Sequence, residues 1–317
     1  MKSTDFNKPP TLHDSIVAVV VIYRPESELL QQLVEAIRPQ VDALWLINNG
    51  SALDLGFLQE RIEHGEVLAE IIQLPSNLGI GEAIARGAER AHTEGYAFLL
   101  TLDQDSVPDA DMVAHLLAAY RQLHAQAHPV AAVGPQQIDR RSAHHAAFMA
   151  PIQQWPTPRR RIYPQDDTHI EVDHLITSGM LAPLSTYLAI GMPRADLFID
   201  YVDIEWSLRA RHCGYKLYAV GGAVLNHSIG DNYRCFRGKQ VPIHSPLRNY
   251  YLIRNGIYLQ KLPSISLAWK VSDSFQLLKK FTFFALFLPE RSKRIRMMLR
   301  GLRDGLHSKL GIYQERL

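Results

Sequence analysis

The chain has 317 residues, enough for one large domain or two small ones, with 47% hydrophobic residues, 21% charged residues and a net charge of +2. Two cysteines cannot supply a disulfide framework or a structural zinc site, and no apolar stretch reaches the length of a membrane-spanning helix. The basic residues do not surround base-stacking motifs, which argues against a nucleic-acid partner.

Strand and helix patterns alternate through the first two-thirds of the chain. The first fifteen residues lack the apolar segment of a signal peptide, and we expect a short disordered lead-in. We predict strands at 16–22, 44–47, 70–74, 96–102 and 130–134, and helices at 28–37, 81–92 and 111–124. This alternation is typical of an α/β fold with a mostly parallel sheet between helices. Residues 136–172 have no clear periodicity and predict a long loop.

Polar clusters follow four of the predicted strands. They are Tyr23-Arg24-Pro25, Asn48-Asn49, Pro75-Ser76-Asn77 and Asp103-Gln104-Asp105. Ligands of such sheets bind outside the carboxyl ends of the strands, so we expect these clusters to line one rim.

The acidic cluster raises a question of charge. Asp103 and Asp105 are two residues apart, and on an extended strand their side chains would point the same way. Close carboxylates raise each other's pKa unless a positive charge is shared between them, and oxygen ligands suit Mg²⁺ or Mn²⁺. By themselves these residues are compatible with two interpretations: a metal site, or a solvated turn that caps the next helix. Asp109, beyond Pro108, is expected to start that helix.

Two segments of small residues are candidates for close approach to a ligand. Residues 76–81 (SNLGIG) join a strand to a helix, where glycines admit a ligand to the backbone. This is not a dinucleotide loop, and alone it is a weak motif. Residues 177–180, with Ser178 and Gly179, favour a tight turn entering a strand when taken alone.

Residues 198–211 (FIDYVDIEWSLRAR) hold Asp200, Asp203 and Glu205 ahead of a helix. Asp203 would lie at the positive end of that helix and could act as a general base toward a hydroxyl group. The alternative is helix capping, with Asp203 as the N-cap and Glu205 in the first turn. The two roles are compatible.

Later in the chain, His227 ends an apolar segment. A lone histidine is more often a satisfied polar residue than a metal ligand, unless it completes a site begun by Asp105. Arg248 and Arg254 lie at helical spacing among tyrosines, where they could bind phosphate or belong to a packed surface helix.

Between residues 270 and 309, ten Lys or Arg residues stand against three Asp or Glu residues and alternate with Phe, Leu and Met. A membrane-surface helix has this pattern. The alternative is a helical pair packed on the domain with a solvated basic face.

Taken in order, these motifs resemble family 2 inverting glycosyltransferases with the GT-A fold, and more narrowly the bacterial rhamnosyltransferases that use dTDP-L-rhamnose. The resemblance runs from Ile16 to Tyr258. It rests on N-N-G-S, S-N-x-G-x-G, L-D-Q-D-S, S-G-x-L, F-I-D-Y-V-D-I-E-x-S-L-R and N-H-x-x-G.

The resemblance implies a role for each matching residue. Asp203 would be the catalytic base, and Asp105, with Asp103 and His227, would bind Mg²⁺ or Mn²⁺. Glu205, Arg248 and Arg254 would be possible diphosphate or acceptor contacts. Asn48 stands where many relatives have an aspartate that reads the pyrimidine, and residues 191–194 (GMPR) depart from the usual G-x-F-D-E on the acceptor side. The nucleotide sugar would contact Tyr23, Arg24, Asn48, Asn77, Gly79, Asp103, Gln104, Ser178 and Gly179.

It further implies a GT-A domain at 16–260, a basic amphipathic helical region at 261–317, and transfer to a glycan or lipid-linked acceptor in cell-surface polysaccharide or glycolipid synthesis. We expect a cytoplasmic protein held at the inner face of a membrane through its C-terminal region. The alternatives are a family 2 transferase that uses a UDP-hexose, and a non-catalytic protein that binds a sugar nucleotide or polysaccharide.

Overall fold

The computed structural model describes residues 14–50, 56–66, 68–140, 144–152, 159–227, 233–236, 239–242 and 244–314. Within these ranges, the side chains of residues 56, 57, 59, 227, 233–236 and 239–242 are not described. The predicted lead-in therefore lies almost wholly outside the described residues.

One mixed sheet forms the centre of the molecule. Its strands are β1 (Ile16–Ile22), β2 (Ala43–Asn48), β3 (Glu70–Gln73), β4 (Phe98–Asp103), β5 (Ser106–Pro108), β6 (Val130–Asp139), β9 (His169–Val172), β10 (Met180–Pro183) and β11 (Lys216–His227). Their order is β3-β2-β1-β4-β10-β6-β11-β5, with β9 also paired to β11. The strands β3, β2, β1 and β4 are parallel, as are β6 and β11, whereas β10 runs antiparallel between β4 and β6.

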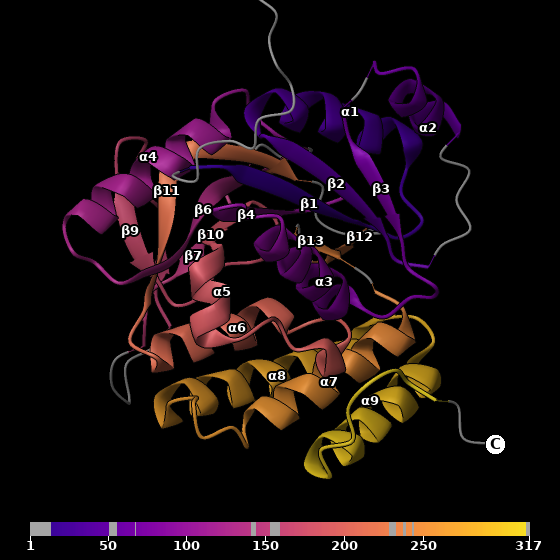
Figure 1. Ribbon diagram of the computed structural model, residues 1–317. Helices are drawn as coiled ribbons and strands as arrows, with labels where there is room; N and C mark the ends of the chain where they lie inside the picture. Colours follow the sequence, from indigo (N-terminus) through magenta and orange to yellow (C-terminus); the bar gives the residue numbers. More distant parts are fainter. Residues whose placement is uncertain are drawn as a thin grey trace, which may run out of the picture.

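Helices cover both faces of this sheet and add a third layer below it (Figure 1). Above the sheet lie α1 (Ser27–Ile37), α2 (Gly56–Glu63) and α4 (Met112–Ala125), and below it lie α3 (Ile80–Thr93), α5 (Leu184–Ile190) and α6 (Val202–His212). The lowest layer contains α7 (Pro246–Leu259), α8 (Leu267–Phe287) and α9 (Arg291–Leu306). Short 3-10 turns, η1 (Arg38–Gln40) and η2 (Ala195–Leu197), follow α1 and precede α6.

Each interface between layers has its own apolar core. Leu30 and Leu116 pack above the sheet, Ile84 and Trp206 pack below it, and Val202 packs with Trp269 and Met298 in the third layer. α6 contributes to both lower cores, so it joins the sheet to the C-terminal helices.

The structure confirms each strand and helix predicted in the first 134 residues, with ends that differ by at most two positions except at the end of β6. α2 and β5, which lie in the same part of the chain, were not predicted. The predicted loop at 136–172 is more ordered than expected where it is described. β6 continues to Asp139, and β7 (Phe148–Met149), β8 (Arg161–Ile162) and β9 lie beyond it. β12 (Tyr233–Phe236) and β13 (Lys239–Pro242) form a separate ribbon.

The C-terminal helices pack against the domain through α6 and one another. Trp269 on α8 and Met298 on α9 are buried, and so is Arg294. Within the described ranges, none of the helices combines the length and the apolarity that a membrane crossing needs.

Candidate active site

A cavity of about 510 Å³ opens where β1 and β4 end, between the rim of the sheet and the C-terminal helices. It brings together three separate parts of the chain. Its polar or charged lining consists of Tyr23, Asn49, Asn77, Asp103, Gln104, Asp105 and Thr177 from the rim, Asp200, Tyr201 and Asp203 from the start of α6, and His244, Arg248 and Lys280 from the C-terminal part.

The acidic tip is a turn rather than a continuous strand. β4 ends at Asp103, Gln104 and Asp105 form a turn, and β5 begins at Ser106. The expectation that the two carboxylates point the same way because they lie two positions apart on one strand therefore does not apply, since Asp105 is outside the strand. Both nevertheless line the cavity.

Two side chains fasten this turn to its neighbours. Gln104 accepts a hydrogen bond from Tyr23 N at 2.7 Å through Oε1 and donates from Nε2 to Tyr23 O at 3.1 Å. Asp103 N donates to Ser178 Oγ at 3.2 Å, and Ser178 Oγ lies 2.7 Å from Ser106 Oγ. Ser178 thus supports the turn from behind, and it is not among the residues that line the cavity.

Asp203 lies in the first turn of α6 and faces the cavity. The N-cap position is occupied by Tyr201, so the capping role expected for Asp203 is wrong. Its Oδ1 accepts a hydrogen bond from Ile204 N at 2.8 Å. Burial raises the pKa of the Asp203 carboxyl and nearby Asp200 raises it further, while His174 and the Ile204 hydrogen bond act in the opposite direction.

Glu205, in the same turn, does not reach the cavity. It is buried and forms an ion pair with Arg209 at 3.0 Å. Arg209 also donates to the carbonyl oxygens of Ile190 and Met192. Because its carboxylate is already bonded on the far side of α6, Glu205 braces the helix instead of facing a ligand.

Among the residues expected to contact the nucleotide, Asn77 and Gly79 line the cavity and Asn48 does not. Asn48 is buried, and its Nδ2 donates to Gln73 Oε1 at 2.7 Å. Its neighbour Asn49 lines the cavity instead and accepts a hydrogen bond from Leu78 N at 2.9 Å.

Gly79 has a φ of +87°, and a Cβ there would lie 2.5 Å from Phe198 O. Only glycine fits both the conformation and the close approach.

Two further residues lie just outside the cavity lining. Arg24 has its guanidinium 5.3 Å from the centre of the Tyr23 ring, and it has a φ of +51°. Gly179 has a φ of +84°, and a Cβ there would lie 2.4 Å from Pro135 Cγ. The segment 177–180 is therefore a tight turn that also presents Thr177 to the cavity.

The two arginines expected to contact diphosphate have different surroundings. Arg248 lines the cavity and forms an ion pair with Asp200 at 3.2 Å. Arg254 is buried, and its guanidinium donates to the carbonyl oxygens of Asp196, Leu197 and Gly311. The structure therefore does not bring Arg254 to the cavity.

Among the cavity residues with acidic or basic side chains, three were not singled out from the sequence as site residues: Asp200, His244 and Lys280. Asp200 stands in the same motif as Asp203, and that proximity was an available signal. Lys280 belongs to the basic C-terminal region and reaches the cavity only because α8 folds back under α6, so no local pattern marks it.

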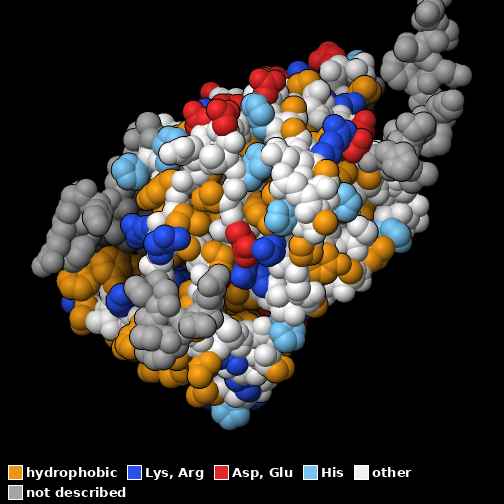
Figure 2. Space-filling view, turned by 90° about the vertical axis from the view of Figure 1, so that its left-hand side faces the viewer, with side chains coloured by type: hydrophobic (Ala, Val, Ile, Leu, Met, Phe, Trp, Pro, Cys, Tyr) orange, Lys and Arg blue, Asp and Glu red, His pale blue; other side chains and the backbone are white. Residues whose placement is uncertain are grey.

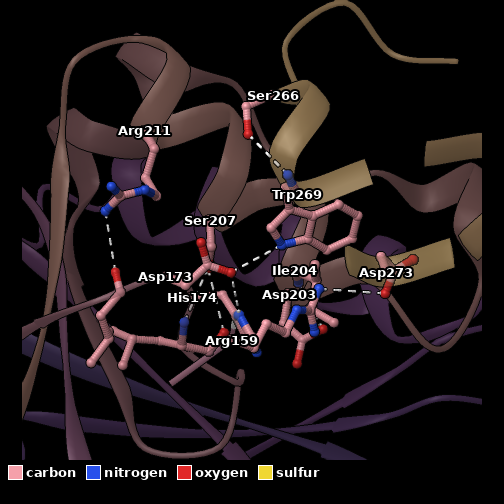
Figure 3. Close-up of polar contacts among 12 residues, drawn as sticks. Arg159, Asp173, His174, Asp203, Ile204, Ser207, Arg211, Ser266, Trp269 and Asp273 are labelled. Carbon is pink, nitrogen blue, oxygen red and sulfur yellow. Dashed lines mark hydrogen bonds and ion pairs between the residues drawn. The ribbon is translucent and has the colours of Figure 1, made fainter. Parts of the chain in front are cut away.

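A network of polar contacts joins α8 to residues beside Asp203. Figure 3 shows two of these contacts, from Trp269 to Asp173 and from Asp273 to Arg159. Asp173 Oδ2 accepts a hydrogen bond from Trp269 Nε1 at 3.0 Å and lies 3.1 Å from His174 Nδ1. Asp273 accepts a hydrogen bond from Tyr201 OH at 3.2 Å. The network fixes α8 relative to the start of α6.

The predicted metal site is only partly described. Among the described side chains, no group of three His, Cys, Asp or Glu residues is arranged to hold a metal ion. The side chain of His227 lies outside the described residues, although its backbone pairs with Ser106, next to Asp105. Asp103 and Asp105 supply oxygen ligands of the kind that Mg²⁺ and Mn²⁺ prefer.

Comparisons with known proteins agree with this architecture. The sequence profile described as glycosyl transferase family 2 matches residues 18–181. The chain is 26% identical over 266 residues to the dTDP-rhamnosyl transferase RfbF of Shigella flexneri, covering 83% of this chain and 85% of that protein.

Solved structures show the same GT-A fold. The structure of GalNAc-T7 with UDP, GalNAc and Mn²⁺ matches 87% of this chain with a TM-score of 0.56 at 16% identity, and the chain spans 58% of the length of GalNAc-T7. The structure of S. aureus TarS 1–349 in complex with UDP-GlcNAc matches 93% of this chain and 81% of its own length, with a TM-score of 0.54 at 12% identity.

Proposed function

The chain belongs to glycosyl transferase family 2, and on that premise we propose that it moves L-rhamnose from dTDP-L-rhamnose to a hydroxyl group of a glycan or glycolipid, with inversion at the anomeric carbon. The observation that carries this proposal is the single cavity that Asp103 and Asp105 share with Asp203, 98 positions later in the chain than Asp105. Likeness to the Shigella flexneri protein supports rhamnose as the transferred sugar.

Asp203 is proposed as the base. As the acceptor oxygen attacks the anomeric carbon, the bond from that carbon to the diphosphate breaks on the opposite face, and the hydroxyl proton passes to the Asp203 carboxylate. A single displacement of this kind inverts the configuration. A carboxyl whose pKa is raised by burial is a stronger base than an ordinary one, which suits removal of a hydroxyl proton.

The charge of the diphosphate would be met on two sides. We place Mg²⁺ or Mn²⁺ at Asp105, with Asp103 and His227 as further ligands, where it would offset negative charge on the leaving group. From the other side, Arg248 and Lys280 line the cavity and supply the chain's own positive charges. Asp200, in an ion pair with Arg248, orients that guanidinium.

The acceptor is proposed to lie at the cytoplasmic face of a membrane. Leu267, Phe275, Leu278 and Leu286 on α8, which we call the α8 stripe, are each more than half exposed. They fall within about 100° of one another around the helix axis. In Figure 2, hydrophobic side chains and Lys or Arg gather on the lower part of the molecule, where the C-terminal helices lie. Apolar side chains beside basic ones suit an anionic lipid surface.

A donor screen tests the proposal. We expect dTDP-L-rhamnose with Mg²⁺ or Mn²⁺ to raise the melting temperature more than UDP-glucose, UDP-galactose or UDP-N-acetylglucosamine does. A ligand at 100 times its Kd stabilises the folded state by about 2.7 kcal/mol, which corresponds to several degrees.

A larger increase in melting temperature with a UDP-sugar would favour the alternative that the protein uses a UDP-hexose. The likeness to the structure of a UDP-GlcNAc complex supports that alternative. If a donor stabilises the protein but is neither transferred to a hydroxyl group nor hydrolysed, the result would instead favour the non-catalytic alternative.

A further inference from the structure

The segment that leads into α6 has an unusual backbone. Phe198, Asp200 and Tyr201 all have φ between +60° and +66°, although none is glycine. Side chains with a Cβ are unfavourable in this left-handed region, and such residues persist only where their surroundings hold them. Residues 198–204 all line the cavity, so the strained backbone lies directly before the proposed base, Asp203.

One buried asparagine on α7 binds this segment from behind. Asn255 is fully buried, and its Nδ2 lies 2.9 Å from Leu197 O, 2.8 Å from Ile199 O and 2.9 Å from Asp200 O. Its two amide hydrogens thus serve three carbonyl oxygens of the same strained segment. No regular secondary structure would satisfy these carbonyl groups in a left-handed turn, so the asparagine takes that place.

Arg254 sets the orientation of that amide. Its Nε donates to Asn255 Oδ1 at 2.9 Å, which turns the NH₂ group toward the segment. Arg254 Nη2 also donates to Leu197 O at 2.9 Å, and the guanidinium lies 4.8 Å from the centre of the Tyr251 ring. The guanidinium is therefore committed to the protein interior and is not available to a diphosphate.

The opposite side of the segment contacts residues 79–81, at the start of α3. Ile80 N donates to Phe198 O at 2.8 Å. Beyond α9, Gly311 N donates to Asp196 O at 2.7 Å, and Gly311 O accepts from Arg254. Residues from α3, α7 and the end of the chain thus converge on residues 196–200.

We infer that Arg254 and Asn255 are positioning residues, which hold residues 197–201 in the conformation that presents Asp200 and Asp203 to the cavity, with positive φ at Phe198, Asp200 and Tyr201. This inference rests on the proposed function, because it takes Asp203 as the base of the transfer. Neither residue lines the cavity. Each acts on the reaction through the backbone that carries the base.

The test compares two asparagines of the same helix. Asn255→Ala removes the amide that binds the segment, and Asn249→Ala removes a second buried amide of α7, whose Oδ1 accepts from Arg294 instead. For Asn255→Ala we expect kcat to fall on the order of 100-fold, since misplacement of a reacting group by about 1 Å has that effect. The fall should be larger in kcat than in the affinity for the donor, because Asp203 acts only in the reaction step.

Hydrogen–deuterium exchange of residues 196–203 provides a readout that does not depend on activity. Exchange there should become faster in Asn255→Ala and stay at the wild-type rate in Asn249→Ala, which should also keep wild-type kcat. If Asn255→Ala does not fold, Arg254→Lys replaces it, since lysine keeps the charge but loses the Nε donor to Asn255.

Wild-type kcat in Asn255→Ala, or unchanged exchange in residues 196–203, would overturn the inference. So would an equal loss of kcat in both asparagine variants, because it would show a general loss of stability. A wild-type protein that transfers no sugar would refute the proposed function instead, and the exchange comparison would still report on the role of Asn255.

Discussion

At the scale of single residues, the surroundings of Asp203 set the pKa and the charge of its carboxyl group. Its carboxyl is held at the start of a helix, close to Asp200 and within the electrostatic reach of His174. Burial is the largest influence on its pKa and raises it. The same cavity contains Asp103, Asp105, Arg248, Lys280 and His244, so the charge of Asp203 also depends on what is bound there.

We expect Asp203→Asn to abolish transfer while donor binding survives. Asparagine keeps the shape and the hydrogen bond from Ile204 N but cannot accept the hydroxyl proton, so kcat should fall on the order of 10²- to 10⁴-fold. Transfer kinetics and a donor titration measure the two effects separately. Substantial turnover in this variant would refute the assignment of the base.

The pH dependence of the wild-type enzyme follows from the same residue. A base must be ionised to accept a proton, so activity is lost as the pH falls through its pKa. Because the pKa of Asp203 is raised, this loss should begin at a higher pH than for an ordinary aspartate. A profile of kcat against pH, with protein stability followed in the same buffers, checks the prediction. An acidic limb in the ordinary aspartate range would contradict it.

Among the elements, the junction of the loop at residues 76–81 with the segment before α6 matters most. Gly79 ends β3's connection to α3, and its Cα faces Phe198 O so closely that a side chain has no room. The two walls of the cavity therefore meet at a glycine. A change there should alter the donor pocket and the segment that carries Asp203 together.

Gly79→Ala should lower both stability and donor affinity. A methyl group would lie 2.5 Å from Phe198 O, and it would add to the cost of a backbone conformation that is essentially restricted to glycine, about 1–3 kcal/mol by itself. Gly65→Ala is the matched control, because Gly65 has a φ of +72° with nothing within 4 Å of its Cβ position. Gly79→Ala should lower the melting temperature and raise the Kd for the donor. Gly65→Ala should lower the melting temperature only. Equal effects at both positions would refute the close-contact argument.

For the molecule as a whole, the C-terminal helices complete the wall of the cavity. α8 carries Lys280 into the cavity, Asp273 to Tyr201 and Trp269 to Asp173. Deleting the region after residue 260 would therefore remove part of the site as well as any membrane contact. The separation of the chain at that residue into a catalytic domain and a basic region stays a prediction, and membrane contact is better tested by surface substitutions.

The double change Phe275→Glu and Leu278→Glu should release the protein from vesicles that contain anionic lipids. Both side chains are more than half exposed in the α8 stripe, so the change removes apolar area and adds repulsion without disturbing the core. Leu188→Glu on α5 is the control, since Leu188 is 52% exposed and lies outside the C-terminal helices. Vesicle flotation measures binding, and retention of the double variant on the vesicles would contradict the proposed membrane contact.

Local patterns in the sequence were sufficient for most strands and helices of the first 134 residues and for the acidic and polar clusters at the rim. Periodicity and turn residues act over a few positions, so residues such as Asp103, Asn77 and Asp203 could be recognised before their surroundings were known. The resemblance to family 2 glycosyltransferases added the order of the motifs. The antiparallel placement of β10 and the third helical layer had no such local mark.

Tertiary packing decided which of the marked residues face one another. Arg248 and Arg254 share a helix and a residue type, yet one lines the cavity and the other is buried against backbone carbonyl groups. Asn49 rather than Asn48 reaches the cavity, and Lys280 arrives there from a distant helix. The sequence by itself determined the chemical groups and the elements that carry them. Only the tertiary structure decided their roles, because the direction of a side chain depends on the burial and hydrogen bonds that remote segments supply.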